Sequence, residues 1–233
     1  MTDLRCCAMH AVIVSLAVAL AGCGRPTEQS VRPDQVIDFN TLYEANCAGC
    51  HGTHGRRGVA QPLNDPVYLA LVSDARLVEV ISRGVRGTPM TAFLGEAGGR
   101  LTKQQVRALV DGIRRNWSDL PRLAGVTPPP YSEADAIAQG SQPGDPSRGR
   151  AAYETYCGRC HGNDGRGGSK AGPLADEAFL SLTSDQALRT MIIAGRRDEE
   201  IPGWREYVPG NPMTNQEVSD VVAWLASHRG NHD

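Results

Sequence analysis

Apolar residues recur at helical spacing in two regions of the chain, residues 37–119 and residues 145–229. In the first region, one apolar face is formed by Ile37, Phe39, Leu42 and Tyr43. This spacing predicts a helix, because residues three or four apart share one helical face. A second short helix is predicted over residues 75–82, and a final helix begins at Thr102, the first residue of a capping box.

The second region repeats the order of the first at an offset of 110 to 112 residues. The matched elements are Pro62-Leu63 with Pro173-Leu174, Tyr68-Leu69 with Phe179-Leu180, Gly84 with Gly195, and Thr102-x-x-Gln105 with Thr214-x-x-Glu217. Self-similarity at a nearly fixed offset is the signature of a duplicated unit. We interpret the two regions as tandem domains that differ by two one-residue insertions.

One pair of positions supports this alignment. Phe39 in the early helix of the first domain corresponds to Gly149 in the second, and Gly112 in the last helix corresponds to Trp224. The large and small residues have exchanged helices, which conserves the volume of a close helix crossing. We therefore predict that the first and last helices of each domain cross at these residues.

The first 36 residues are typical of a removable signal followed by a polar tether. An apolar run over residues 11–21 follows a basic residue and has the length of a signal peptide, too short to span a bilayer in the usual way. Residues 1–23 end in Leu-Ala-Gly-Cys23, which resembles the bacterial lipoprotein box and predicts lipidation of Cys23. The alternative is ordinary signal cleavage near Gly22. Residues 24–36 are polar and contain two prolines, as expected for a flexible tether.

Residues 120–144 separate the two domains and have the composition of a linker. Three consecutive prolines, residues 128–130, predict a stiff polyproline II piece. Residues 131–139 are expected to add one or two helical turns before the second domain begins.

Composition and charge limit the classes of partner and cofactor. Aromatic residues make up 5% of the 233 residues, which is little for cores built from side chains alone. A flat apolar cofactor in each domain would supply the missing bulk. The formal net charge of -2 leaves no basic excess and argues against a nucleic-acid partner.

The most informative motif is Cys-x-x-Cys-His, which occurs at residues 47–51 and again at residues 157–161. This is the attachment pattern for a covalently bound c-type haem. Its cysteines lie on one side of a helical turn, so both sulfurs can reach the two vinyl groups on one porphyrin edge. The histidine that follows supplies the proximal iron ligand. The predicted attachment residues are Cys47, Cys50, Cys157 and Cys160, and the predicted proximal ligands are His51 and His161.

Two other chemistries fit part of this motif. Cys47, Cys50, His51 and His54 make four potential zinc ligands. The second domain has Asp164 in place of His54, so the zinc set is not repeated. A thioredoxin-like Cys-x-x-Cys would need a βαβ setting, which the pattern does not predict. Haem is therefore the favoured interpretation.

The order of helix, Cys-x-x-Cys-His, Pro-Leu loop, short helix, methionine loop and final helix resembles class I cytochrome c. The resemblance covers nearly all of residues 37–229. It implies an all-α fold of two tandem class I cytochrome c domains joined by a Pro-rich linker, with two covalently bound haem c groups. It also implies that the carbonyls of Pro62 and Pro173 accept hydrogen bonds from the proximal histidines, and that Met90 is the distal ligand of the first haem.

The second domain departs from the family pattern at the distal ligand. Met90 lies six residues after the glycine that ends the preceding helix, but Ile201 lies at the same distance in the second domain and cannot ligate iron. The alternatives for this site are Met213 as a tentative ligand, a vacant or water-bound position, or a distant group such as His228. Met213 also aligns with Leu101, where an apolar residue is expected to staple the final helix.

These features predict an electron carrier, not an enzyme, that relays electrons between a membrane respiratory or dehydrogenase complex and a periplasmic redox partner. The alternative is a haem enzyme or small-ligand binder, peroxidase-like, at an open second haem. A lipid on Cys23 would anchor the protein in the bacterial cell envelope facing the periplasm, and Gly24 favours the outer membrane. The acidic residues 198–200 are expected to form either a solvated face or a docking patch for a basic partner.

Overall fold

The computed structural model describes residues 31–118 and residues 125–230. The predicted export signal and the predicted lipidation site at Cys23 lie outside these residues. The beginning of the predicted linker, residues 120–124, also lies outside them.

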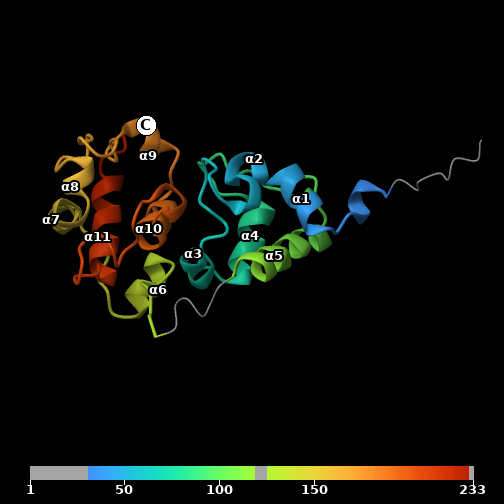
Figure 1. Cartoon of the computed structure of the whole chain (residues 1–233), viewed down its shortest axis with the longest axis horizontal. Coiled ribbons are helices and arrows are strands. Elements are labelled where there is room, and N and C mark those ends of the chain that lie inside the picture. The colour runs from blue at the N-terminus through green and yellow to red at the C-terminus, as the bar shows by residue number, and fades with distance from the viewer. Residues whose placement is uncertain (1–30, 119–124, 231–233) are drawn as a thin grey trace, which may run out of the picture. The chain divides into compact units, whose positions relative to one another are not determined.

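The chain divides into two compact units, Met1–Gln35 and Val36–Asp233. The described part of the first unit contains a short 3-10 helix, η1 (Pro33–Gln35), within the predicted tether. The second unit contains both predicted domains. The helices of the predicted first domain are α1 (Phe39–Asn46), α2 (Ala48–His51), η2 (Thr53–Gly55), α3 (Pro66–Leu71), α4 (Asp74–Arg83), η3 (Gly95–Ala97) and α5 (Lys103–Trp117). After α6 (Glu133–Ala138) in the linker, those of the second domain are α7 (Pro146–Tyr156), α8 (Gly158–His161), α9 (Glu177–Ser181), α10 (Asp185–Ala194), η5 (Arg197–Glu199) and α11 (Asn215–Ala226). Every regular element in the described residues is a helix (Figure 1), so the predicted all-α fold class is confirmed.

Local sequence signals explain where the main helices begin and end. Thr102 and Thr214 each form the predicted capping box, at the start of α5 and α11 respectively. Gly84 and Gly195 follow α4 and α10 with φ of 71° and 74°, a backbone region that glycine adopts without steric cost. Each glycine therefore ends its helix and turns the chain into the loop that was predicted to carry the distal ligand.

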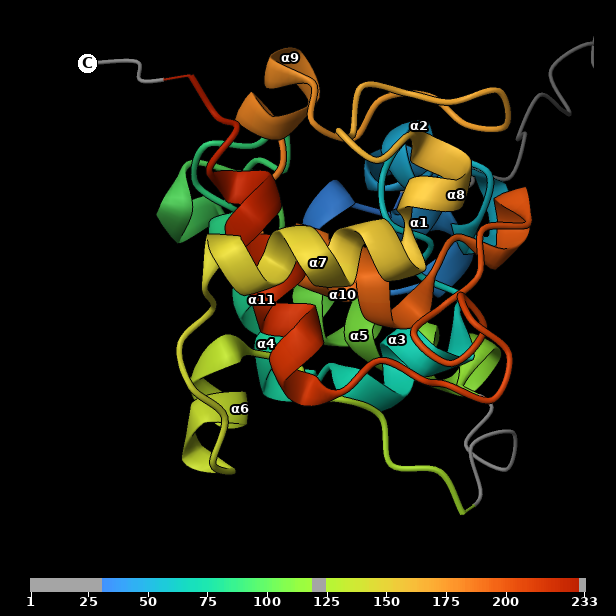
Figure 2. The ribbon, with the colours of Figure 1, turned by 90° about the vertical axis from the view of Figure 1, so that its left-hand side faces the viewer.

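The predicted helix crossing is present in both domains. A Cβ atom added to Gly112 on α5 would lie 2.1 Å from the ring of Phe39 on α1. A Cβ atom added to Gly149 on α7 would lie 1.9 Å from the carbonyl oxygen of Asp220 and 2.8 Å from Cβ of Trp224, both on α11. Figure 2 shows α7 lying across α11. The exchange of large and small residues between the crossing helices is therefore confirmed.

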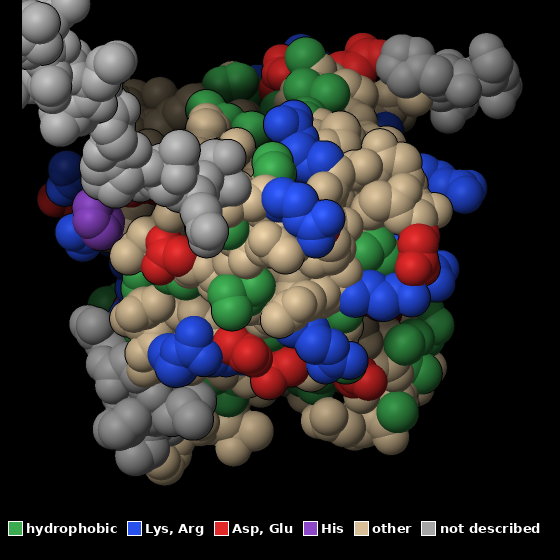
Figure 3. All heavy atoms as spheres, turned by 90° about the vertical axis from the view of Figure 1, so that its right-hand side faces the viewer, with side chains coloured by type: hydrophobic (Ala, Val, Ile, Leu, Met, Phe, Trp, Pro, Cys, Tyr) green, Lys and Arg blue, Asp and Glu red, His purple; other side chains and the backbone are tan. Residues whose placement is uncertain are grey.

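The surface carries charges of both signs. On the face drawn in Figure 3, Lys and Arg side chains lie among Asp and Glu side chains, with hydrophobic side chains between them. Exposed ion pairs join Lys103 to Glu96 and Arg76 to Glu79, each at 2.8 Å. This mixed arrangement agrees with the small net charge of the chain.

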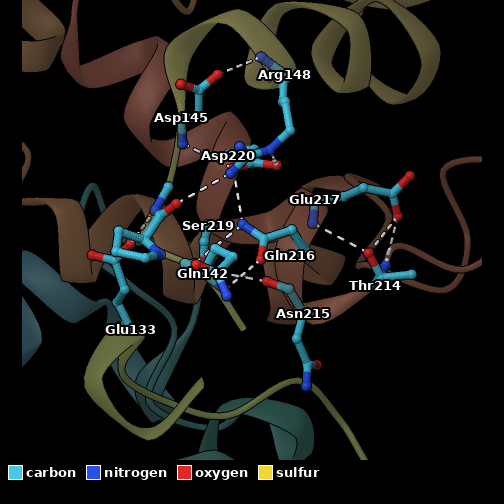
Figure 4. Close-up of polar contacts among 12 residues, drawn as sticks. Glu133, Gln142, Asp145, Arg148, Thr214, Asn215, Gln216, Glu217, Ser219 and Asp220 are labelled. Carbon is cyan, nitrogen blue, oxygen red and sulfur yellow. Dashed lines mark hydrogen bonds and ion pairs between the residues drawn. The ribbon is translucent and has the colours of Figure 1, made fainter. Parts of the chain in front are cut away.

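Asp220 adds a polar network to the crossing in the second domain (Figure 4). Its buried carboxylate accepts hydrogen bonds from the guanidinium of Arg148 at 2.8 and 2.9 Å and from the backbone N–H of Asp145 at 2.8 Å. The side-chain amide of Gln216 donates a further bond at 3.0 Å. Burial alone would raise the pKa of Asp220, but these donors outweigh it and the pKa lies below its usual value. The network ties the start of α7 to α11.

One arginine in each domain fixes the end of the helix that follows the Pro-Leu loop. Arg114 on α5 donates to the carbonyls of Leu69 and Val72, and to the carboxylate of Asp74 at 2.6 Å. These carbonyls lie at the end of α3, where helical carbonyls lack an intrahelical partner. In the second domain Arg229 donates to the corresponding groups of Leu180, Thr183 and Asp185.

Replacement of Arg114 by alanine is expected to lower the free energy of unfolding by about 1–3 kcal/mol, because it leaves carbonyl groups without their donor. Arg229→Ala should have an effect of the same size. Arg150→Ala is the matched control, since its ion pair with Glu154 is exposed and should contribute about 0.5 kcal/mol or less. Denaturant unfolding measures all three. An Arg114→Ala variant as stable as the control would contradict the assigned role.

Candidate functional site

The first Cys-x-x-Cys-His motif forms a single helical turn. Cys47 ends α1, and its carbonyl accepts hydrogen bonds from the N–H groups of Cys50 at 3.2 Å and His51 at 3.0 Å. Gly58 packs against this turn, since a Cβ atom there would lie 2.2 Å from the carbonyl oxygen of Cys50. The two thiols and the imidazole are thus presented from one rigid turn.

The second motif has the same geometry. The carbonyl of Cys157 accepts hydrogen bonds from the N–H groups of Cys160 at 3.1 Å and His161 at 3.0 Å. Gly168 takes the place of Gly58, with its added Cβ atom 2.5 Å from the carbonyl oxygen of Cys160. The structure therefore brings together the predicted attachment and proximal residues in both domains.

Each motif histidine is oriented by a backbone carbonyl. The Nδ1 atom of His51 lies 2.8 Å from the carbonyl oxygen of Gln61, and that of His161 lies 2.7 Å from the carbonyl oxygen of Gly172. The predicted acceptors, Pro62 and Pro173, were wrong by one residue. In both domains the carbonyl that contacts the imidazole belongs to the residue before the proline.

This contact fixes the tautomer of the neutral ring. A carbonyl only accepts, so Nδ1 carries a proton, and in the neutral imidazole Nε2 then has the lone pair. For His51, burial lowers the pKa, the hydrogen bond to Gln61 opposes this, and the positive charge of Arg196 lowers it further, with a net decrease. The imidazole of His51 is therefore neutral at pH 7, the state that can ligate a metal through Nε2.

Cys47 and Cys157 do not have the properties of reactive thiolates. Burial, aided by the neighbouring Cys50, raises the pKa of Cys47 to about 12, and burial with Cys160 raises that of Cys157 to about 12. A nucleophilic cysteine needs a lowered pKa. Within residues 31–118 and 125–230, no three His, Cys, Asp or Glu side chains are placed to hold a metal ion.

Met90 and Ile201 occupy equivalent places. Each carbonyl accepts a hydrogen bond from the residue that follows the helix-ending glycine, Val85 at 2.8 Å and Arg196 at 3.1 Å. The two glycines also pack in the same way, because an added Cβ atom would lie 2.5 Å from the carbonyl oxygen of Met90 and 2.6 Å from that of Ile201. The two ends of the distal loops are therefore equivalent, and the second loop has isoleucine where the first has a thioether.

Met213 lies in the core at the position equivalent to Leu101. It is 2% exposed, and its N–H donates to the carbonyl of Trp204 at 2.9 Å. Leu101 is 5% exposed and makes the same bond to Phe93 at 2.7 Å. This placement agrees with the apolar staple and lends no support to Met213 as an axial ligand.

The other candidate side chains lie away from the distal loop or are already paired. Nδ1 of His228 donates to the carbonyl of Trp224 at 2.8 Å, and the imidazole ring packs edge-on against the indole of Trp224. Asp198 and Glu199, predicted as a solvated or docking face, form ion pairs with Arg196 at 3.2 and 2.8 Å. Asp198 is also nearly buried. Sequence reasoning missed Arg196, and no motif in the sequence points to it.

Within the described residues, no helix is both long enough and apolar enough to cross a bilayer.

Comparison with known proteins supports the cytochrome interpretation for both halves. Residues 146–229 match the family described as Cytochrome c, and residues 35–111 match the family described as Cytochrome C oxidase, cbb3-type, subunit III. The Cbb3-type cytochrome c oxidase subunit CcoP of Azospirillum sp. (strain B510) is 27% identical over 181 residues, covering 70% of this chain and 54% of the relative. The subunit FixP of Rhizobium meliloti (strain 1021) is 26% identical over 173 residues, covering 70% and 52%.

The chain spans about half the length of these curated relatives. A solved structure, the Kuenenia stuttgartiensis reducing HAO-like protein complex Kustc0457/Kustc0458, aligns with 82% of this chain and 96% of its own at 18% identity. Its TM-score of 0.42 is too low to carry an argument. The helical fold of the described residues agrees with the two cytochrome family matches, which cover residues 35–111 and 146–229 and support a c-type cytochrome.

Proposed function

We propose that the chain is a dihaem electron-transfer protein. Cys47 and Cys50 would hold the first haem and Cys157 and Cys160 the second, each through two thioether bonds. His51 and His161 would be the proximal ligands. The observation that carries this proposal is the pair of matching turns, each with an imidazole whose Nδ1 is bound to a carbonyl and whose Nε2 is left for iron. When bound, the haem supplies one-electron chemistry that no side chain here provides.

The distal residues favour electron transfer over catalysis. Met90 would close the first site as sixth ligand, in keeping with its place in the loop after Gly84. An enzyme at the second site would need a free acid or base near the iron. Two of the three acidic side chains of the second distal loop, Asp198 and Glu199, are instead engaged with Arg196, and Glu200 is the third. Among the described residues, this loop therefore offers no unpaired carboxylate from those positions.

The partner is proposed from the relatives and from the predicted export of the chain. The curated relatives are named as subunits of cbb3-type cytochrome c oxidases. We propose that this chain exchanges electrons with a respiratory complex of that class or with a periplasmic redox protein. Lipidation of Cys23 would hold it at the cell envelope, facing the periplasm.

A redox titration of the purified protein is expected to give two haems per chain with separate potentials. A His/Met pair raises the potential of haem iron, so the first haem should be the higher of the two. A Cys157→Ala/Cys160→Ala variant should retain only the first haem, with the higher potential. It therefore shows which of the two potentials belongs to which haem. A single potential for both haems, or the reverse order, would contradict the proposed direction of flow from the second haem to the first.

Ligand binding at the second haem is the second candidate function, because Ile201 stands where a ligand is expected and is 37% exposed. Carbon monoxide added to the reduced protein is expected to bind at the second haem and not at the first. Absence of binding at both haems would show that another group fills the sixth position of the second iron, and would remove this candidate.

A further inference from the structure

The distal loop of the second domain contacts the loop that follows the first Cys-x-x-Cys-His motif. The guanidinium Nη2 atom of Arg196 donates to the carbonyl oxygen of Gly58 at 2.9 Å. In the reverse direction, the backbone N–H of Arg57 donates to Oδ2 of Asp198 at 2.8 Å. Two hydrogen bonds therefore join residues about 140 positions apart, one donated from each side.

The two side chains that make this contact also hold each other. Nε and Nη2 of Arg196 lie 3.2 and 3.3 Å from the two carboxylate oxygens of Asp198. The side chain of Arg196 is 12% exposed and that of Asp198 is 6% exposed. A bidentate pair with little solvent access has a fixed geometry, and its remaining donors and acceptors need partners. The backbone groups of Arg57 and Gly58 are those partners.

The first domain has no charged pair at the corresponding positions. Val85 and Gly87 stand in place of Arg196 and Asp198, and the hydroxyl of Thr88 donates to the carbonyl of Val85 at 2.9 Å. The two loops begin and end alike but differ between these points, since in the described residues the second contains η5 and the first does not.

Backbone strain is concentrated at the same contact. Three described non-glycine residues have positive φ, and two of them are Arg57 at 61° and Glu200 at 60°, one on each side. Such conformations cost free energy and persist where the surroundings fix them. The contact supplies such surroundings.

The contact reaches the haem-binding turn itself. Gly58 packs on this turn, since an added Cβ atom would lie 2.5 Å from the carbonyl carbon of His51. On the other side, the N–H of Arg196 donates to the carbonyl of Ile201 at 3.1 Å. Hydrogen bonds and packing therefore connect Ile201, at the distal position of the second site, with the turn that carries His51.

We propose that Arg196 and Asp198 are positioning residues that clamp the distal loop of the second domain onto the Cys-x-x-Cys-His turn of the first, and that this clamp sets the path for electron exchange between the two sites. The second part rests on the proposed dihaem function. One electron leaves the second site and one is accepted at the first, with no bond made or broken and no further reactant.

The clamp is tested on the full haem-loaded chain with the variants Arg196→Ala and Asp198→Asn. Amide hydrogen exchange at Arg57 is expected to become about tenfold faster or more in both, because its acceptor is lost or weakened. The rate of internal electron transfer after flash photoreduction should fall at least about tenfold, since the two sites are no longer held together. Arg197→Ala is the matched control: its ion pair with Glu206 at 3.0 Å stays within the second domain, so both readouts should be unchanged.

The clamp would be overturned if amide hydrogen exchange at Arg57 were equally fast in Arg196→Ala, Asp198→Asn and Arg197→Ala. Faster hydrogen exchange with an unchanged rate of electron transfer would overturn the role of the clamp in electron transfer. Unchanged protection of α10 and α11 shows that the second domain remains folded, and the nearly isosteric Asp198→Asn carries the test if Arg196→Ala does not fold. If the chain proved to hold no haems that exchange electrons, amide hydrogen exchange at Arg57 would still show whether the clamp exists.

Discussion

Replacement of Met90 by isoleucine is expected to lower the potential of the first haem by roughly 100 mV or more, because axial ligands shift haem potentials over a range of about 0.8 V. The variant copies what the second domain already has, since Met90 and Ile201 make the same backbone contacts with the residues at the end of the preceding helix. Loss of a thioether ligand removes the preference for the reduced iron. A redox titration measures the shift, and spin resonance should show the first iron changing from low to high spin.

The reciprocal variant Ile201→Met should raise the potential of the second haem, since the loop after Gly195 already presents this position as the loop after Gly84 does. Ile201→Leu is the control, because it keeps an apolar side chain of similar volume. Met213→Leu should leave both potentials unchanged if Met213 is a core residue. If the first haem had the same potential in the native chain and in Met90→Ile, Met90 would not be its ligand.

Local patterns predicted what depends on neighbouring residues in the chain. The Cys-x-x-Cys-His turns, both capping boxes and the glycines that end α4 and α10 follow from residues within a few positions of one another. The crossing of Phe39 with Gly112 was also predictable, because a duplicated sequence shows the exchange of large and small residues as a paired change. In this respect the second domain served as a comparison for the first.

The sequence alignment did not predict which residues fill equivalent space. Trp117 packs on Tyr43 with ring centroids 5.0 Å apart, and Trp224 packs on Tyr153 at 4.2 Å. The two tyrosines align, but the two tryptophans do not: Trp224 aligns with Gly112. A large side chain can reach the same volume from different turns of a helix, so packing conserves the filled space and not the position.

The contact of Arg196 and Asp198 with the first domain was unpredictable for a different reason. In the sequence, the acidic residues 198–200 look like a solvated face or a docking patch. Asp198 instead accepts a hydrogen bond from the backbone N–H of Arg57, and Arg196 donates one to the backbone carbonyl of Gly58. A pattern of residue types cannot show a backbone donor or acceptor about 140 residues away, so only the folded chain identifies these two contacts.

Gly149→Ala is expected to destabilise the second domain by about 1–3 kcal/mol or more, the usual range for overpacking a close contact. Its added Cβ atom would lie 1.9 Å from the carbonyl oxygen of Asp220, a backbone atom of α11 that cannot rotate away. Alanine is a better helix former than glycine by about 1 kcal/mol, so the clash must exceed this gain. The two helices would have to separate, which also strains the hydrogen bonds that Asp220 receives.

Two other glycines provide the controls. Chemical denaturation monitored in the haem absorption band measures the free energy of unfolding of all three variants. At Gly112 the three atoms nearest to the added Cβ all belong to the ring of Phe39, a side chain that can shift, so Gly112→Ala should cost less than Gly149→Ala. At Gly95 on η3 the nearest atom, the carbonyl oxygen of Leu101, lies 3.6 Å away, so Gly95→Ala should change the stability least. A Gly149→Ala variant that is no less stable than Gly112→Ala would mean that α7 and α11 do not meet backbone to backbone in solution.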